Sequence, residues 1–257
     1  MYTLCGKDRI HPSTDGHLVM AYLFLKAQGL AGKPVADIRI DGAGKKVTRS
    51  DNCRVSDLSV SSDNLTFTYE AKSLPYPIDT SYYDNEKHTQ ADALSVIPFM
   101  DEMNYEGLSV SGLSDGYYGL TIGGEFIGRF TARELERGIN MTLLQNTPQY
   151  KQAMKIRQMN EERWLKERKM REFYWVEYNL MRKTGMLWAC NEAAVDTLRK
   201  YRPHDIFLQW NGDLWLQYMH KGIREDCVNE QQDLVNRIYE QNKPIPLRIE
   251  IKKFTDL

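Results

Sequence analysis

Residues 36–49 read Ala36-Asp-Ile-Arg-Ile40-Asp-Gly-Ala-Gly44-Lys-Lys-Val-Thr-Arg49, and this stretch decides the fold class. Apolar and polar residues alternate as far as position 40, which is typical of a strand with one buried face. The Asp-Gly-Ala-Gly segment predicts a turn and a second strand follows it, so the stretch reads as a β-hairpin. Further strands are expected at residues 55–60, 65–69, 108–112, 117–122 and 125–130. Six or seven short strands with turns between them indicate a small antiparallel, sandwich-like β-domain.

The chain on either side of this β-domain has the periodicity of helices. Ser13 and Thr14 are suitable N-caps for a first helix that ends at Gly29, and its residues 18–25 are all apolar. A helix that is apolar all round belongs inside a large core. After the β-domain, helices are expected at 131–138, where Thr131 and Glu134 form a capping box, and at 147–183, 186–201 and 212–241, with a last strand at 244–252. The expected fold class is therefore α+β.

The composition limits the possible functions. The chain has 257 residues, of which 42% are hydrophobic and 27% charged, which is the balance of a globular protein. Its net charge of −1 provides no global field that would attract nucleic acid, and its longest apolar run falls well short of the roughly 20 residues that a membrane span needs. The absence of a C-x-x-C pair argues against a zinc site and leaves buried free thiols or a disulfide for Cys5, Cys53, Cys190 and Cys227.

Asp8 and His11 form the sharpest chemical pattern in the sequence. A histidine can take a proton from a nucleophile when a carboxylate on its other ring nitrogen fixes the tautomer. Three residues of separation in a tight loop let Asp8 reach the ring of His11, and Pro12 stiffens that loop ahead of the first helix. On spacing alone, a surface salt bridge is the simpler interpretation.

The residues around this pair extend the pattern. The block Asp8-Arg-Ile-His11-Pro12-Ser-Thr-Asp-Gly16-His17-Leu-Val-Met-Ala21 resembles the last conserved block of the SGNH/GDSL hydrolases, and a looser resemblance to an accessory region continues to about residue 183. The resemblance implies a bacterial, lipase-like acylhydrolase or esterase, periplasmic or secreted. In it His11 would be the general base and Asp8 its orienting partner, with no metal or organic cofactor. The implied partner is an ester substrate, with acetylated polysaccharides as one candidate.

The resemblance also implies a division into three segments. Residues 1–30 would be the last block and helix of a flavodoxin-like α/β SGNH domain, residues 31–146 an antiparallel β accessory domain, and residues 147–257 a mainly helical C-terminal region. The family's nucleophile would lie before Met1, so we assign no nucleophile and no metal ligand in this chain. The chain alone is then expected to be a catalytically incomplete C-terminal portion, which would need a missing N-terminal catalytic segment as a partner.

Other residues with chemical potential receive simpler interpretations. Ser114 and the segment Asn211-Gly212-Asp213 read as turns, and His17 as a helix-surface or packing residue. His88, near Asp84 and Glu86, reads as part of a solvated loop rather than a metal site. A last set of residues suggests either packed core or a sugar-stacking platform: Trp188, Trp210, Trp215 and Tyr218.

Two alternatives stay open at this point. The chain could be a non-catalytic module that binds a glycan or another protein, with Asp8 and His11 as a remnant. The apolar first helix needs cover, which predicts either packing within the chain or a homodimer through this helix. The substrate-binding residues are not assigned.

Overall fold

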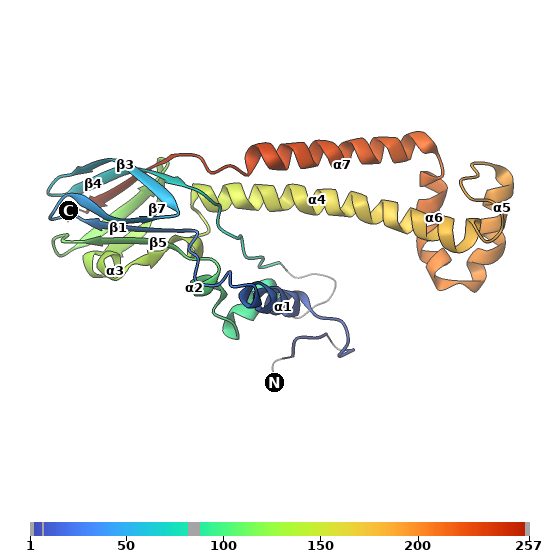
Figure 1. Ribbon diagram of the computed structural model, residues 1–257, viewed down its shortest axis with the longest axis horizontal. Coiled ribbons are helices and arrows are strands. Elements are labelled where there is room, and N and C mark those ends of the chain that lie inside the picture. The colour runs from blue at the N-terminus through green and yellow to red at the C-terminus, as the bar shows by residue number, and fades with distance from the viewer. Residues whose placement is uncertain (1–2, 7, 82–87, 255–257) are drawn as a thin grey trace. The chain divides into compact units, whose positions relative to one another are not determined.

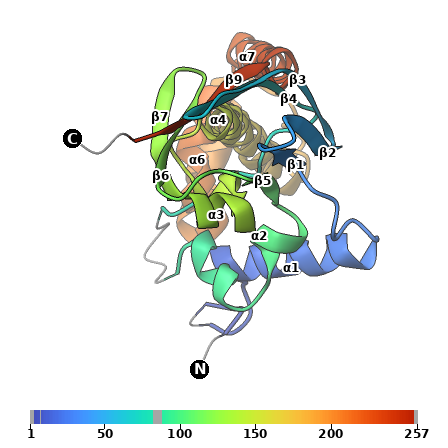
Figure 2. The same ribbon diagram turned by 90° about the vertical axis from the view of Figure 1, so that its left-hand side faces the viewer.

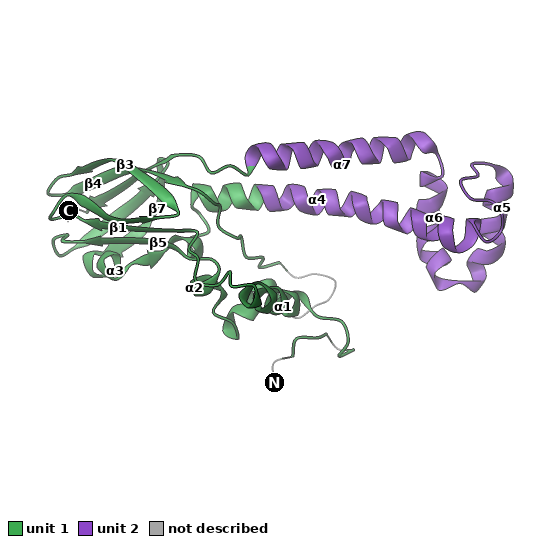
Figure 3. Cartoon of the chain, viewed as in Figure 1, with its two compact units in different colours: residues 1–155, 242–257 green, residues 156–241 purple. Residues whose placement is uncertain are grey.

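Figure 1 shows the computed structural model, which describes residues 3–6, 8–81 and 88–254. The fold is α+β, as the sequence predicts. The chain divides into two compact units (Figure 3): residues 1–155 together with 242–257 form unit 1, and residues 156–241 form unit 2. The three segments expected from the sequence, with boundaries after residues 30 and 146, stay a prediction. Within the described ranges, no helix is both long enough and apolar enough to cross a membrane.

Unit 1 contains two β-sheets. The first has the strand order β2-β1-β5-β8, with bounds β1 Ala36–Asp41, β2 Lys46–Asp51, β5 Glu106–Ser111 and β8 Ile139–Asn140. The second has the order β3-β4-β9-β6-β7, with bounds β3 Cys53–Val60, β4 Asn64–Ala71, β6 Tyr117–Ile122, β7 Glu125–Thr131 and β9 Leu247–Lys253. The hairpin predicted from residues 36–49 is confirmed as the antiparallel pair β1–β2. However, β1 pairs with β5 in parallel, so the first sheet is mixed and the expectation of a wholly antiparallel domain is corrected.

The two sheets share one hydrophobic core because each presents a face of alternating apolar side chains. Ile38 and Leu108 from the first sheet are at most 1% exposed, and so are Phe67, Leu120 and Ile249 from the second. Burying each side chain of this size contributes about 1.5–3 kcal/mol. The last strand, β9, lies between β4 and β6 in the middle of its sheet (Figure 2), so the C-terminal part of the chain completes this core.

A short helix next to the sheets shows how a local pattern sets an element. Helix α3 spans Ala132–Arg137, and its N-cap Thr131 forms the predicted capping box with Glu134. It ends at Gly138, whose φ of 92° is one that glycine adopts without strain.

We expect Thr131→Ala to lower the free energy of unfolding by about 1 kcal/mol, because the first turn of α3 loses a side-chain acceptor. Thr131→Ser keeps the hydroxyl and should stay close to wild type. Urea unfolding followed by circular dichroism measures both, and equal losses in the two variants would contradict the capping role.

Helix α1 (Thr14–Ala27) packs against the short helices η1 (Gln90–Ser95) and α2 (Phe99–Glu102). Its Leu18, Val19 and Tyr22 are buried there, whereas Met20, Leu23 and Phe24 are 52–65% exposed. The expectation of a helix buried on all sides is therefore wrong, because the partners of α1 cover only one face. Nor does the structure confirm the flavodoxin-like remnant, since the described residues that pack on α1 come from short helices and a loop. A homodimer through the exposed face stays a prediction.

Unit 2 is helical. Helix α4 (Pro148–Val176) enters it from unit 1 and continues into a π-helical turn, η3 (Glu177–Met181). The chain then forms α5 (Glu192–Tyr201), η4 (Arg202–His204), α6 (Ile206–Tyr218) and α7 (Lys221–Gln241). The buried side chains of unit 2 make a core of their own around Phe173, Trp215 and Met181.

One turn expected in unit 2 does not exist. Asn211-Gly212-Asp213 lies inside α6 rather than before a helix. The Arg202 guanidinium packs about 3.1–3.3 Å from where a Gly212 Cβ would be, and it donates to both oxygens of Asp213 at 2.6 and 2.7 Å. Gly212 thus makes room for an arginine and does not form a turn.

Candidate functional site

The loop that carries Asp8 and His11 folds back on itself at the start of α1. The backbone N–H of Gly6 donates to the His11 carbonyl at 2.9 Å, and the N–H of Ser13 donates to the Leu4 carbonyl at 3.2 Å. The carbonyl of Leu4 lies so close to Gly16 in α1 that a side chain at position 16 would collide with it. The loop is therefore held against the first turn of the helix.

Within this loop Asp8 holds His11 in one orientation. Asp8 Oδ2 lies 2.6 Å from His11 Nδ1, and Asp8 Oδ1 accepts the backbone N–H groups of Ile10 and His11 at 3.0 and 3.1 Å. The hydrogen bond to the His11 side chain, followed by those from the backbone, lowers the pKa of Asp8 to about 2. The carboxylate is thus ionised at neutral pH and favours a proton on Nδ1, which leaves Nε2 as the acceptor.

This pair is open to solvent. The side chain of His11 is 84% exposed and that of Asp8 is 49% exposed. In the part of the chain that the structure describes, the imidazole has no side-chain partner besides Asp8. The two side chains thus meet in the arrangement that the sequence suggests, while their assignment as catalytic residues stays a prediction.

A second polar cluster lies at the same end of α1, and the sequence interpretation missed it. Asp15 is fully buried and accepts the Ser13 hydroxyl and the Gly16 N–H. His88 Nδ1 lies 4.0 Å from a carboxylate oxygen of Asp15 and 4.0 Å from one of Asp92. The predicted neighbours of His88, Asp84 and Glu86, lie outside the described residues. Among the described side chains, no group of three or more His, Cys, Asp or Glu residues could hold a metal ion.

Ser114 and the exposed histidine of α1 have structural surroundings. The hydroxyl of Ser114 is 3.1 Å from the Tyr118 hydroxyl and accepts from Lys253 Nζ at 2.8 Å, and no imidazole of the described residues is bonded to it. His17 is exposed on α1, so of the two interpretations the surface one is confirmed.

All four cysteines are free thiols. Cys53 and Cys227 are buried, as expected, but Cys190 is exposed and its sulfur lies 3.3 Å from His220 Nδ1. This pair was not found from sequence because 30 residues separate its members and neither lies in a recognisable motif.

The aromatic platform considered from the sequence is not formed as a unit. Trp215 and Tyr218 are buried core residues, at 0% and 6% exposed, whereas Trp188 and Trp210 are 45% and 67% exposed. The interpretation of these aromatic residues as packed core is therefore confirmed for Trp215 and Tyr218 only.

Comparison with known proteins adds two findings. Residues 154–243 match the family model described as the diltiazem deacetylase C-terminal helical domain. A solved structure described as a gut microbial diltiazem-metabolizing enzyme is 40% identical, with a TM-score of 0.92, and the alignment covers 98% of this chain and 57% of that one. This chain therefore spans somewhat more than half the length of the enzyme that it resembles. No curated protein matches the chain significantly.

These findings correct the family expected from the sequence. They relate the chain to a diltiazem-metabolizing enzyme and to a diltiazem deacetylase domain, and they provide no support for an SGNH/GDSL hydrolase. The function inferred from that resemblance was the C-terminal portion of an SGNH serine ester hydrolase, and it is wrong for the same reason. The alternative of a non-catalytic module is not better supported by these findings. The sequence resemblance was misleading because it rested on a short D-x-x-H-P block before an apolar helix. The structural match is stronger evidence because it covers nearly the whole chain.

Proposed function

We propose that this chain serves in an enzyme that hydrolyses acetyl esters, with Asp8 and His11 as its proton-transfer pair. The observation that carries the proposal is the 2.6 Å contact between Asp8 and His11 Nδ1, which leaves Nε2 open at the surface. The substrate class comes from the relatives, one described as a diltiazem-metabolizing enzyme and one as a domain of a diltiazem deacetylase.

The geometry supports a simple sequence of proton transfers. An attacking water molecule gives one proton to Nε2 of His11, and its oxygen bonds to the ester carbonyl carbon. When the tetrahedral intermediate collapses, His11 returns the proton to the leaving alkoxide, and the products are the alcohol and acetate. Asp8 stays ionised throughout and stabilises the imidazolium, since its pKa of about 2 is far below neutrality.

The second part of the proposal is that this chain does not supply the attacking oxygen from one of its own side chains. No serine, threonine or cysteine side chain of the described residues shares a hydrogen bond with His11. This supports the view that the chain by itself is catalytically incomplete and forms no covalent acyl intermediate. Its turnover should be slow, because nothing among these residues holds the attacking oxygen in place.

Hydrolysis of p-nitrophenyl acetate by the purified chain tests the proposal. His11→Ala should lower kcat/KM by about 100-fold through loss of the general base, and Asp8→Asn should lower it by at least about tenfold through loss of the preferred tautomer. His17→Ala removes another exposed histidine nearby and is the matched control, expected at the wild-type rate. Equal rates in the His11 and His17 variants would refute the general-base role.

The same assay examines the missing nucleophile. A rapid mixing experiment should show no initial burst of p-nitrophenol, and intact-mass measurement should show no acetyl adduct that depends on His11. Ser114→Ala should be unaffected, because its hydroxyl is bonded to Tyr118 and Lys253. A burst abolished by any single serine or cysteine substitution would show that this chain does carry its own nucleophile.

A further inference from the structure

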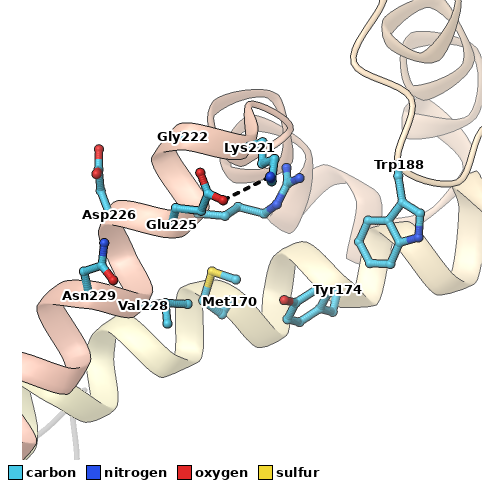
Figure 4. Close-up of a pocket in the computed structure, with 10 residues that line it drawn as sticks. Met170, Tyr174, Trp188, Lys221, Gly222, Glu225, Asp226, Val228 and Asn229 are labelled. Carbon is cyan, nitrogen blue, oxygen red and sulfur yellow. Dashed lines mark ion pairs between the residues drawn. The ribbon is translucent and has the colours of Figure 1, made fainter.

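Unit 2 has an open pocket of about 640 Å³, a volume within the range of small-ligand sites. Figure 4 shows its two sides. Met170 and Tyr174 line it from α4, and Trp188 lines it from the loop between η3 and α5. The other side comes from the first turns of α7 and is mostly polar: Lys221, Arg224, Glu225, Asp226 and Asn229, with Gly222 and Val228.

The position of Trp188 is fixed by two unusual features. Its φ of 63° is left-handed, a conformation that costs a tryptophan energy and is held only where the surroundings enforce it. The enforcing group is Glu177 in the π-helical turn, which is 1% exposed and accepts the Trp188 backbone N–H at 2.8 Å through one oxygen and the Trp215 indole N–H at 2.8 Å through the other. Both strained backbone and π-turns concentrate at functional sites.

The result is an exposed aromatic surface held in place. The Trp188 ring packs nearly perpendicular to Tyr174 and to Tyr178, with ring centroids 6.0 and 5.9 Å away. Even so, Trp188 is 45% exposed and Tyr174 38% exposed. The Trp188 ring, whose backbone is held by the buried Glu177 carboxylate, is therefore available to a ligand.

The charges of the pocket restrict what that ligand is. The lining contains two cations, Lys221 and Arg224, and two anions, Glu225 and Asp226, and Lys221 pairs with Glu225 at 3.1 Å. The guanidinium of Arg224 donates to the backbone carbonyls of Tyr218 and Met219. The pocket therefore has no net charge to offer, and a neutral ligand fits it better than an ionic one.

We infer that this pocket binds a neutral saccharide. A pyranose ring has an apolar face of C–H groups, which would lie on the exposed ring of Trp188, and in a saccharide of several units the hydroxyls of a further unit would bond with Asp226 and Asn229 on α7. This site uses none of the residues of the Asp8–His11 pair and does not depend on the proposed function.

Affinity electrophoresis of the full chain through gels that contain xylan, glucomannan or pullulan tests the inference. We expect at least one of these neutral polysaccharides to retard the wild-type chain. Trp188→Gly removes the ring, relieves the left-handed backbone, and should weaken binding by at least about tenfold in Kd. Trp210→Ala removes an indole that is 67% exposed outside the pocket and should bind like wild type.

A second variant separates binding from folding. Asn229→Ala lies at an exposed position of α7, so it should leave the thermal unfolding temperature unchanged and still weaken retardation. Two results would overturn the inference: no retardation of the wild-type chain by any of the three polysaccharides, or equal retardation of the Trp188 and Trp210 variants.

Discussion

Trp215→Ala should lower the free energy of unfolding of unit 2 by about 4 kcal/mol or more. Trp215 is fully buried in the core of this unit, and its indole N–H donates to Glu177 Oε1 at 2.8 Å. Truncation would therefore leave a large cavity and remove one of two hydrogen bonds from a buried carboxylate. Urea unfolding followed by circular dichroism at 222 nm measures the loss.

The chain offers controls for both parts of this effect. Trp215→Phe keeps most of the volume but not the N–H group, so it isolates the hydrogen bond to Glu177, worth about 1–3 kcal/mol. Trp210→Ala in the same helix removes an exposed ring and should change the free energy of unfolding by no more than about 0.5 kcal/mol. If Trp210→Ala and Trp215→Ala unfolded at the same urea concentration, the core role of Trp215 would be refuted.

The sequence predicts local elements well because their signals are local. The hairpin at 36–49, the capping box at Thr131 and the helix start at Pro148 all appear where the pattern placed them. The pairing of distant strands was not predictable in this way. Leu65 of β4 lies opposite Ile251 of β9, and nothing near either residue specifies that partner. The parallel β1–β5 pair is of the same kind, which is why the first sheet was expected to be antiparallel.

The two candidate sites also differ in whether their contacts are local or distant in sequence. The contact between Asp8 and His11 forms over three residues in one loop, so spacing was enough to predict it. The saccharide pocket joins α4, the loop at Trp188 and the start of α7, and it depends on a backbone conformation and a buried Glu177 that no sequence pattern announces. Local resemblance also misled: the block at 8–21 suggested a family that the comparison of nearly the whole chain does not support.

Glu106→Gln should flatten the pH dependence of stability in unit 1. Glu106 is fully buried at the start of β5, where its carboxyl group accepts the Tyr69 hydroxyl at 2.7 Å and faces the Gln149 amide nitrogen at 3.3 Å. Burial raises its pKa from 4.5 to about 7, while the hydrogen bonds from Tyr69 and Gln149 act in the opposite direction. The protonated form also suits the site, because the amide oxygen of Gln149 has no hydrogen-bond partner among the described residues and an O–H could reach it once the amide turns.

The direction of the pH effect follows because the pKa of Glu106 is higher in the folded state than in the unfolded state. The contribution of Glu106 to stability is complete below pH 4.5 and is lost as the pH rises through about 7, because the folded state must then hold a buried charge. At about 1.36 kcal/mol per pKa unit, the unfolding free energy of Glu106→Gln minus that of wild type should increase by about 3 kcal/mol between pH 4.5 and pH 8. Glu134→Gln is the control of opposite sign: hydrogen bonds from Thr131 lower the pKa of the exposed Glu134, so its contribution disappears as the pH falls. Urea unfolding at a series of pH values measures both variants, and a constant difference between Glu106→Gln and wild type would show that Glu106 does not titrate in this range.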